Sequence, residues 1–168
     1  RALGGHHRQP EREECRKRGA RIDSVGFDAA KKIKGVKRHI ATDTQGLLLN
    51  AIVHPANVQD RDGAVDLLKE LKTLFPGLKL IWADNGYNAK KLTDAFNDMG
   101  DWKLEIVKRS DTAKGFEVLP RRWVVERTFA WMGRNRRLAK HFECLAATAL
   151  AYLKLAMIQL MLRRLART

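Results

Sequence analysis

Short apolar runs alternate with longer amphipathic runs along this chain of 168 residues, and few folds accommodate that order. Residues 78–83 read Leu-Lys-Leu-Ile-Trp-Ala, which predicts a buried strand ending at Asp84. Residues 103–107 predict another strand. The neighbouring runs repeat their apolar side chains at helical spacing. We therefore predict one helix over residues 60–75 and a second helix that follows the turn at residues 85–87 and ends at about Met99. Strands joined through helices are typical of an α/β sheet.

The first third of the chain predicts extended structure. Residues 20–25 form a short strand-like run that carries Asp23 near its end, and two longer extended runs surround an Asp-Thr-Gln-Gly turn at residues 43–46, as in a β-hairpin. The chain closes with predicted helices over residues 121–140 and 147–167. The order β, β-hairpin, α, β, α, β, α, α predicts a mixed α/β sheet flanked by helices. This is the ribonuclease-H-like topology, although several α/β folds share parts of it.

A polar segment precedes a single predicted domain. Residues 1–20 are rich in charge and lack apolar periodicity, so we predict a tail or linker there and one domain over residues 21–168. Residues 145–162 are almost entirely apolar and nearly long enough to cross a bilayer. Lys154 lies in the middle of that run, which favours a buried C-terminal helix over a membrane span.

The cysteines and the first residues bear on the cellular compartment. Cys15 and Cys144 stand outside any Cys-x-x-Cys pattern, so we predict free thiols in a reducing cytosol. No apolar run follows a basic segment near Arg1, so no secretory signal is predicted. The sequence starts at arginine and not at methionine, which predicts a fragment or the downstream product of a split reading frame.

Lysine and arginine outnumber aspartate and glutamate by 33 to 19, which leaves a formal net charge of +14. An excess of this size indicates a polyanionic partner, most often nucleic acid. A solubilising or ribosomal-type basic surface is the alternative, and an acidic membrane lipid is a weaker one. We therefore predict a nucleic-acid-binding protein.

Glu126 lies in a segment, residues 121–132, whose other side chains are mostly apolar, aromatic or basic. No proline or glycine interrupts this segment, so it predicts a helix. A carboxylate with neighbours such as Trp123 is partly desolvated unless a positive group meets it. An ion pair with Arg122, one turn earlier, is one explanation. A divalent metal ion is the other, and two upstream aspartates favour it.

Asp23 and Asp84 each end a predicted strand, and Glu126 lies on a later helix that can pack beside those strand ends. Taken singly, each aspartate is explained as a turn or cap residue. Three converging carboxylates, however, repel one another unless a cation joins them, and magnesium prefers such oxygen ligands. Two such ions activate a nucleophilic oxygen and stabilise the leaving oxygen of a phosphodiester. The pattern predicts metal-assisted phosphoryl transfer, with Asp23, Asp84 and Glu126 as catalytic and metal-binding residues.

Basic residues around these carboxylates are candidates for phosphate contacts. At about 100° per helical residue, Arg122 and Arg137 fall on the same side of the predicted helix as Glu126. Other basic side chains extend this track on the helix or form a second strip upstream. These further candidates are Arg134, Arg136, Lys31, Lys32, Lys34, Lys37 and Arg38. Such contacts position a nucleic-acid backbone and carry no sequence information.

Four segments of the chain form a recognisable set of motifs. They are Ile-Asp-Ser at residues 22–24, the basic run at residues 31–39, Ile-Trp-Ala-Asp-Asn-Gly-Tyr at residues 81–87, and Arg-Arg-Trp-Val-Val-Glu-Arg-Thr-Phe-Ala-Trp at residues 121–131. Together these segments resemble bacterial insertion-sequence DDE transposases of the insertion-sequence-five type. The resemblance extends over residues 22–165, and the last segment is very specific.

The resemblance implies a ribonuclease-H-like catalytic domain that uses Mg²⁺, with Mn²⁺ as a substitute, to cleave transposon ends and join them to target DNA. The three acids of the family correspond to Asp23, Asp84 and Glu126. The implied partners are double-stranded DNA and either a second copy of the chain or the product of an upstream reading frame. The implied location is the nucleoid in the bacterial cytoplasm, without a membrane partner.

The chain departs from the family's pattern at several places. The glutamate helix of the family carries Tyr-x2-Arg-x3-Glu-x6-Lys, and here Leu119 and Gly133 occupy the tyrosine and lysine positions. The segment between Asp23 and Lys31 is shorter than in the family by about a dozen residues, the length of one short hairpin. The family also carries an upstream domain that recognises transposon ends, and we expect that domain to lie outside this sequence. Two alternatives follow: a DNA-binding remnant or inhibitor without cleavage activity, and a host nuclease of the same fold.

Overall fold

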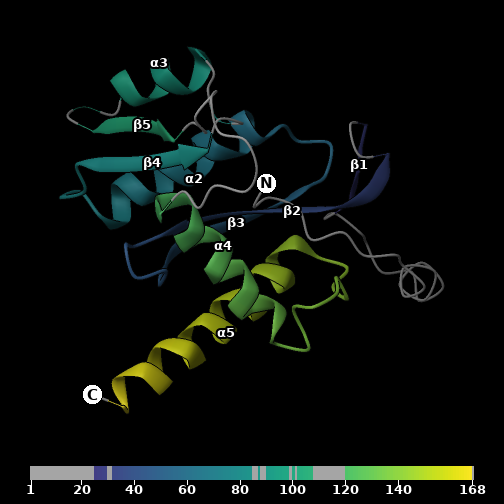
Figure 1. Cartoon of the computed structure of the whole chain (residues 1–168). Coiled ribbons are helices and arrows are strands. Elements are labelled where there is room, and N and C mark those ends of the chain that lie inside the picture. Colours follow the sequence, from purple (N-terminus) through teal and green to yellow (C-terminus); the bar gives the residue numbers. More distant parts are fainter. Residues whose placement is uncertain are drawn as a thin grey trace, which may run out of the picture.

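The computed structural model describes residues 25–29, 32–84, 87, 90–98, 100, 102–107 and 120–167, with only the backbone at positions 33, 90, 91, 98 and 120–122. In chain order the elements are β1 (Gly26–Asp28), β2 (Ile33–Thr42), β3 (Leu48–Pro55), α2 (Asp60–Leu74), β4 (Leu80–Asp84), α3 (Lys90–Asp98), β5 (Lys103–Val107), α4 (Pro120–Gly133) and α5 (Ala146–Leu165). Figure 1 shows the long β2–β3 hairpin in the middle of the molecule, with α2 on one side and α5 on the other.

The predicted β-hairpin is confirmed, and its turn shows why it forms there. The Asp43 carboxylate accepts hydrogen bonds from the backbone N–H groups of Gln45 and Leu47, each at 2.8 Å. Gly46 has a φ of 81°, a backbone conformation that favours glycine. β2 begins at Ile33. Most of the basic run at residues 31–39, whose side chains were predicted to contact phosphates, therefore belongs to this strand.

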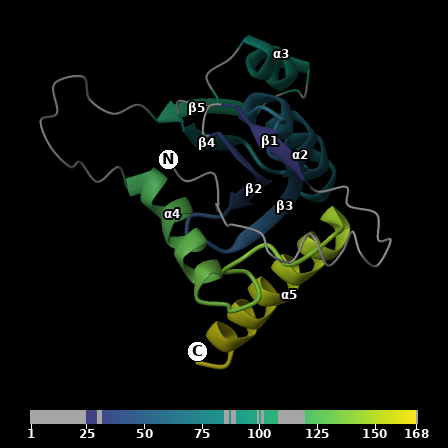
Figure 2. The same cartoon turned by 90° about the vertical axis from the view of Figure 1, so that its right-hand side faces the viewer.

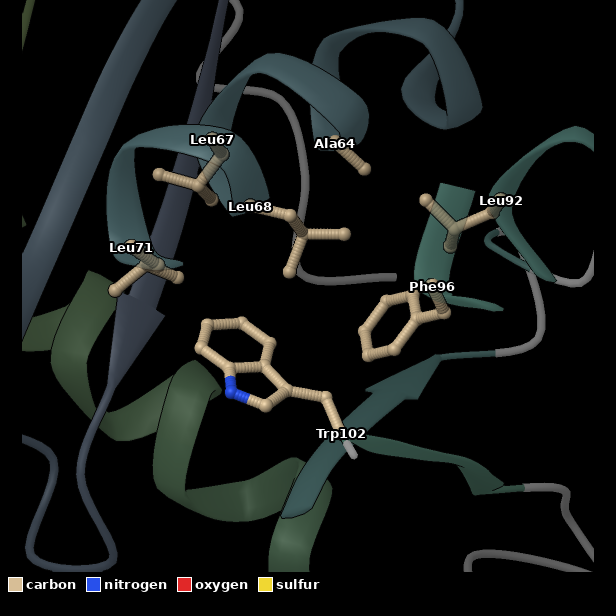
Figure 3. Close-up of a cluster of buried hydrophobic side chains, with 7 residues drawn as sticks. All are labelled: Ala64, Leu67, Leu68, Leu71, Leu92, Phe96 and Trp102. Carbon is tan, nitrogen blue, oxygen red and sulfur yellow. The ribbon is translucent and has the colours of Figure 1, made fainter. Parts of the chain in front are cut away.

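One face of the hairpin packs against α2. The buried side chains of this first cluster come from α2, from α3 and from the start of the β5 segment (Figure 3); they are Ala64, Leu67, Leu68, Leu71, Leu92, Phe96 and Trp102. Ala41 of β2 and Ile52 of β3 pack against them. The helical spacing of the α2 residues is the spacing that predicted this helix, and the structure confirms it over Asp60–Leu74.

The opposite face of the hairpin packs against α4 and α5. In this second cluster, Ala51 of β3 meets side chains of α4, of α5 and of the segment between them; they are Met132, Leu138, Leu153 and Met157. Ala51 and Ile52 are neighbours in the chain and belong to opposite clusters, as the alternation of side chains along a strand requires. β2 is a central strand, because β1 pairs with one of its edges and β3 with the other. The two clusters cover both of its faces.

The described strands form two sheets, where the sequence predicted one mixed sheet. β1, β2 and β3 pair antiparallel in the order β1-β2-β3, and β4 pairs with β5 in parallel. The α/β class, with antiparallel and parallel pairing flanked by helices, is therefore confirmed. The strand predicted at residues 20–25 lies almost wholly outside the described residues, and β1 begins at Gly26.

α4 ends at Gly133, well before the predicted end at residue 140. Turns replace the helix: the Asn135 N–H donates to the carbonyl of Met132, and the Asn135 side-chain oxygen accepts from the N–H of Arg137 at 3.1 Å. Because the helix has ended, Arg137 does not share a helical face with Glu126. The prediction that helical phase would bring these two residues together is wrong.

α5 buries only one of its faces. Ala149, Leu153 and Met157 are buried, whereas the opposite face is exposed. By length and composition alone, the helix could cross a membrane. Only 17% of its most apolar 18-residue stretch is buried inside the protein. The predicted buried C-terminal helix is thus buried along one face alone.

The cysteine prediction needs correction. Cys144, which lies just before α5, is disulfide-bonded, and no described cysteine is a free thiol. The expectation of two free thiols is therefore wrong. Cys15, the other cysteine of the chain, lies outside the described residues.

Candidate active site

Asp84 is the last residue of β4, as the sequence predicted. It lies beside Val107, the last residue of the parallel strand β5, so that both strands end at the same edge of their sheet. Its side chain is partly buried. Carboxyl ends of parallel strands are where α/β proteins place ligands, because the chain diverges there and leaves the edge accessible.

Glu126 lies in the middle of α4, which packs against β2 and β4. Figure 2 shows α4 extending from the β4 side of the molecule toward α5. Two contacts hold α4 to the hairpin turn: the Thr128 hydroxyl donates to the Gly46 carbonyl at 2.7 Å, and Arg127 donates to the Gln45 carbonyl at 2.8 Å. The rotation of α4 is thereby fixed, and the Glu126 side chain is left partly buried.

The convergence of the three predicted carboxylates stays a prediction. Asp23 lies outside the described residues. Within the described part of the chain, no group of three His, Cys, Asp or Glu side chains is arranged to hold a metal ion. Asp84 and Glu126 come from elements that pack together, so the structure brings two of the three segments to the same region.

A buried polar cluster lies behind Asp84, and the sequence did not predict it. The Tyr87 hydroxyl lies 3.5 Å from Nδ1 of His39, and the His39 and His54 rings meet edge to face with centroids 5.2 Å apart. Burial, with smaller effects of Asp60 and Asp84, raises the pKa of Tyr87. This cluster joins Tyr87, which follows β4 in the chain, to β2, and the only signal for it in the sequence was the histidines in apolar strands.

His39 is held neutral inside this cluster. Burial, and then the nearby His54, lowers its pKa to about 4, against an opposing effect of Asp60. Its Nε2 is buried without a hydrogen-bond partner among the described residues. A Cβ at Gly63 would lie 2.5 Å from that atom, so glycine in α2 is what allows the ring to fit.

Two of the predicted phosphate-binding residues point into the protein. The ammonium group of Lys37 lies 3.2 Å from Asp60 and 4.0 Å from Asp28, and it donates to the Val58 carbonyl at 2.8 Å. On the other face of β2, the Arg38 guanidinium donates to the Leu138 carbonyl, in the turn after α4, at 3.1 Å. Burial lowers the pKa of Arg38. Both follow from the central position of β2, where alternate side chains enter the two helix-covered faces.

The remaining basic candidates divide into three groups. Arg134, Arg136, Lys32 and Lys34 are exposed. Arg137 is also exposed, but its guanidinium pairs with Glu143 at 2.6 Å and stacks over Tyr152, with 4.8 Å to the ring centroid. Lys31 and the side chain of Arg122 lie outside the described part of the structure.

An aromatic and cationic stack runs along α4 and was not predicted. Arg127 lies over Trp123 at 4.5 Å and over Trp131 at 4.9 Å, measured to the ring centroids, and Arg164 of α5 lies over Trp131 at 4.3 Å. Trp123 is 45% exposed. The four-residue spacing of Trp123, Arg127 and Trp131 could have indicated the stack, since residues four apart are neighbours on a helix.

Comparison with known proteins relates these features to a family. A sequence model of the transposase DDE domain matches residues 5–161. The chain is also 35% identical over 129 residues to the proposed transposase of insertion sequence element IS402 from Burkholderia cepacia. That alignment covers 72% of this chain and 60% of the relative, so the chain spans less than two thirds of the relative's length. No solved structure matches the chain.

Proposed function

Because the chain belongs to the transposase DDE domain family, we propose that it is the catalytic part of an insertion-sequence transposase that cleaves transposon ends and transfers the strands to target DNA. The observation that carries the proposal is the position of Asp84 at the end of β4 and of Glu126 on the helix that packs against β4. The family relation also supports a ribonuclease-H-like arrangement, with Asp23 completing the site.

The donor set fits a hard divalent cation. Asp84 and Glu126 offer carboxylate oxygens from partly buried positions, and magnesium prefers oxygen ligands. Together with Asp23 they would hold Mg²⁺, or Mn²⁺ in its place. When bound, the metal supplies an activated oxygen nucleophile and stabilises the leaving oxygen. The protein's own contribution is to hold Asp84 on a strand end and Glu126 on a helix whose rotation is fixed by Thr128.

The exposed basic residues support a DNA-binding surface on the α4 side of the molecule. Arg134 and Arg136 follow α4 directly and carry exposed side chains. Lys37 and Arg38 belong to the interior of the β2 layer and serve its stability. We therefore narrow the proposed phosphate contacts to Arg134, Arg136, Lys32, Lys34 and Arg137, together with Lys31 and Arg122, for which the structure describes no side chain.

Nicking of a supercoiled plasmid in the presence of Mn²⁺ tests the proposal. Asp84→Asn and Glu126→Gln should each lower the nicking rate by about a hundredfold or more, because each removes a metal ligand. DNA affinity should stay within about threefold of the parent chain, because phosphate contacts by Lys and Arg supply most of that affinity. Asp66→Asn, an exposed carboxylate on α2, is the matched control and should nick normally.

A DNA-binding remnant or inhibitor without cleavage activity is the second candidate. It is favoured by the departures from the family's pattern at Leu119 and Gly133, where the family carries tyrosine and lysine. It predicts DNA binding by the parent chain with no Mn²⁺-dependent nicking at all. Mn²⁺-dependent nicking by the parent chain therefore separates the two candidates. If the parent nicks, Asp23→Asn tests the third ligand: a loss of nicking equal to that of Asp84→Asn supports the three-carboxylate site, and parent-like nicking contradicts it.

A further inference from the structure

One face of α5 forms a row of exposed apolar side chains. Leu155, Ile158, Leu162 and Leu165 are between 47% and 69% exposed, and exposed Ala151 extends the row toward the start of the helix. Single exposed leucines are common on protein surfaces, but a continuous row along one helix marks an interaction site. We call these five positions the α5 seam.

The spacing of the α5 seam is that of a helix that pairs with another helix. From Ala151 to Leu165 the intervals are four, three, four and three residues, which is the heptad pattern of coiled-coil contacts. The opposite face of α5 is occupied by the second hydrophobic cluster, so the seam faces away from that cluster. Residues on the seam therefore have the register needed for knobs-into-holes packing.

We propose that the α5 seam pairs with the α5 seam of a second copy of this chain, antiparallel and about a twofold axis near Ile158. A twofold contact requires a surface that is complementary to itself. The seam meets this condition because Leu155 of one copy faces Leu162 of the other, while Ile158 faces Ile158. The pairing does not depend on the proposed enzymatic function.

The charges beside the seam favour the antiparallel orientation. Lys154 borders the seam on one side and faces Met161 of the second copy in this arrangement, so no like charges meet. Arg163 and Arg164 follow near the end of the helix, and Arg164 is engaged with Trp131 of α4. An antiparallel pair separates these basic ends, whereas a parallel pair would gather them.

The exposed area suffices for a reversible dimer. The larger seam residues and their neighbour Tyr152 leave roughly 100 Å² each exposed, so two copies cover on the order of 1,000 Å². This lies at the lower limit for a specific protein interface. We therefore expect a dimer that forms at micromolar concentrations and dissociates on dilution.

Sedimentation velocity over about 1–200 µM chain tests the pairing. The parent chain should shift from monomer to dimer, and Ile158→Glu should raise the dissociation constant more than about tenfold, as expected for a central interface residue. Ile158→Lys should do the same, and an equimolar mixture of the two variants should recover the dimer, which a misfolded variant cannot do. Arg163→Glu is the control: it places a glutamate on exposed α5 surface about 120° around the helix from Ala151, away from the seam.

Each remaining outcome contradicts the proposal. A parent chain that stays monomeric at the highest concentration shows that the seam does not pair two copies. A dimer that Ile158→Glu leaves intact places the contact on another surface. Flotation of the parent chain with neutral phosphatidylcholine vesicles, abolished by Ile158→Glu and accompanied by no dimer in solution, identifies a lipid surface as the occupant instead.

Discussion

At the scale of single residues, the polar side chains inside the protein are the least expected feature. Lys37 forms ion pairs with Asp60 and Asp28 inside the protein, where the sequence alone indicated a phosphate contact. His39 and Tyr87 meet although 48 positions separate them in the chain. Groups of this kind are stable in the interior only because each finds a partner or stays uncharged.

The low pKa of His39 predicts a stability change with pH. The unfolded chain binds the proton near the ordinary value of 6.5, and the folded chain binds it only near 4. The free energy of unfolding should therefore fall as the pH drops from about 6.5 to about 4, by on the order of 3 kcal/mol from this group. Urea unfolding of His39→Gln and the parent chain at pH 7 and pH 4.5 measures the difference.

A control variant isolates this effect from other titrating groups. Thr73→Val, an exposed change on α2 that adds or removes no titrating group, should keep the pH dependence of the parent chain. If His39→Gln shows the same dependence as the parent, then His39 is not the group responsible.

At the scale of elements, the hairpin turn and α4 fix each other. Gly46 has little room: a Cβ there would lie 2.8 Å from the Thr128 hydroxyl oxygen and 3.2 Å from the Trp131 ring. The Thr128 hydroxyl, fully buried, bonds the Gly46 carbonyl at 2.7 Å and the Val124 carbonyl at 3.1 Å. The helix that carries Glu126 is thus positioned by a turn that lies 82 residues before Thr128.

Removing that hydroxyl tests the contact. Thr128→Val keeps the shape of the side chain and leaves the Gly46 carbonyl without its donor, so the free energy of unfolding should fall by about 1–3 kcal/mol. Thr73→Val is the matched control, because the exposed Thr73 hydroxyl bonds only the carbonyl four residues earlier, at 3.3 Å. It should change stability by less than about 0.5 kcal/mol. Equal losses in both variants would show that the turn does not anchor α4.

At the scale of the whole molecule, a central hairpin separates two hydrophobic clusters, and basic side chains such as Arg134 and Arg136 are exposed. The net charge of +14 predicts salt-sensitive DNA binding whether or not the chain cleaves DNA. Burial of Lys37 and Arg38 removes two cations from the DNA-binding set, so the exposed arginines after α4 should contribute most.

The salt dependence of DNA binding measures that contribution. Replacing Arg134 and Arg136 by alanine should reduce the slope of log affinity against log salt by about 1.8, since each lost phosphate contact with duplex DNA accounts for about 0.9. Lys69→Ala, on the far α2 side of the hairpin, should leave the slope unchanged. A slope equal to the parent's in the double variant would remove these arginines from the proposed surface.

Local patterns in the sequence were enough to predict most of the elements. The Asp43 turn, the helical spacing in α2, the apolar run ending at Asp84 and the strand Lys103–Val107 all depend on neighbours within a few positions. The same local reasoning failed at the end of α4, where it extended helical phase past Gly133 and so placed Arg137 beside Glu126. A local pattern cannot show where the surrounding structure turns the chain.

The sequence by itself determined the order of strands and helices, the family, and Asp84 and Glu126 as candidate site residues, because these follow from periodicity and motif. Only the tertiary structure decided which charges are inside. β2 is covered on both faces, so alternation sends Lys37 toward α2 and Arg38 toward α4 and α5. The tertiary structure likewise left the α5 seam uncovered, since one helix can bury only the face that meets its own domain.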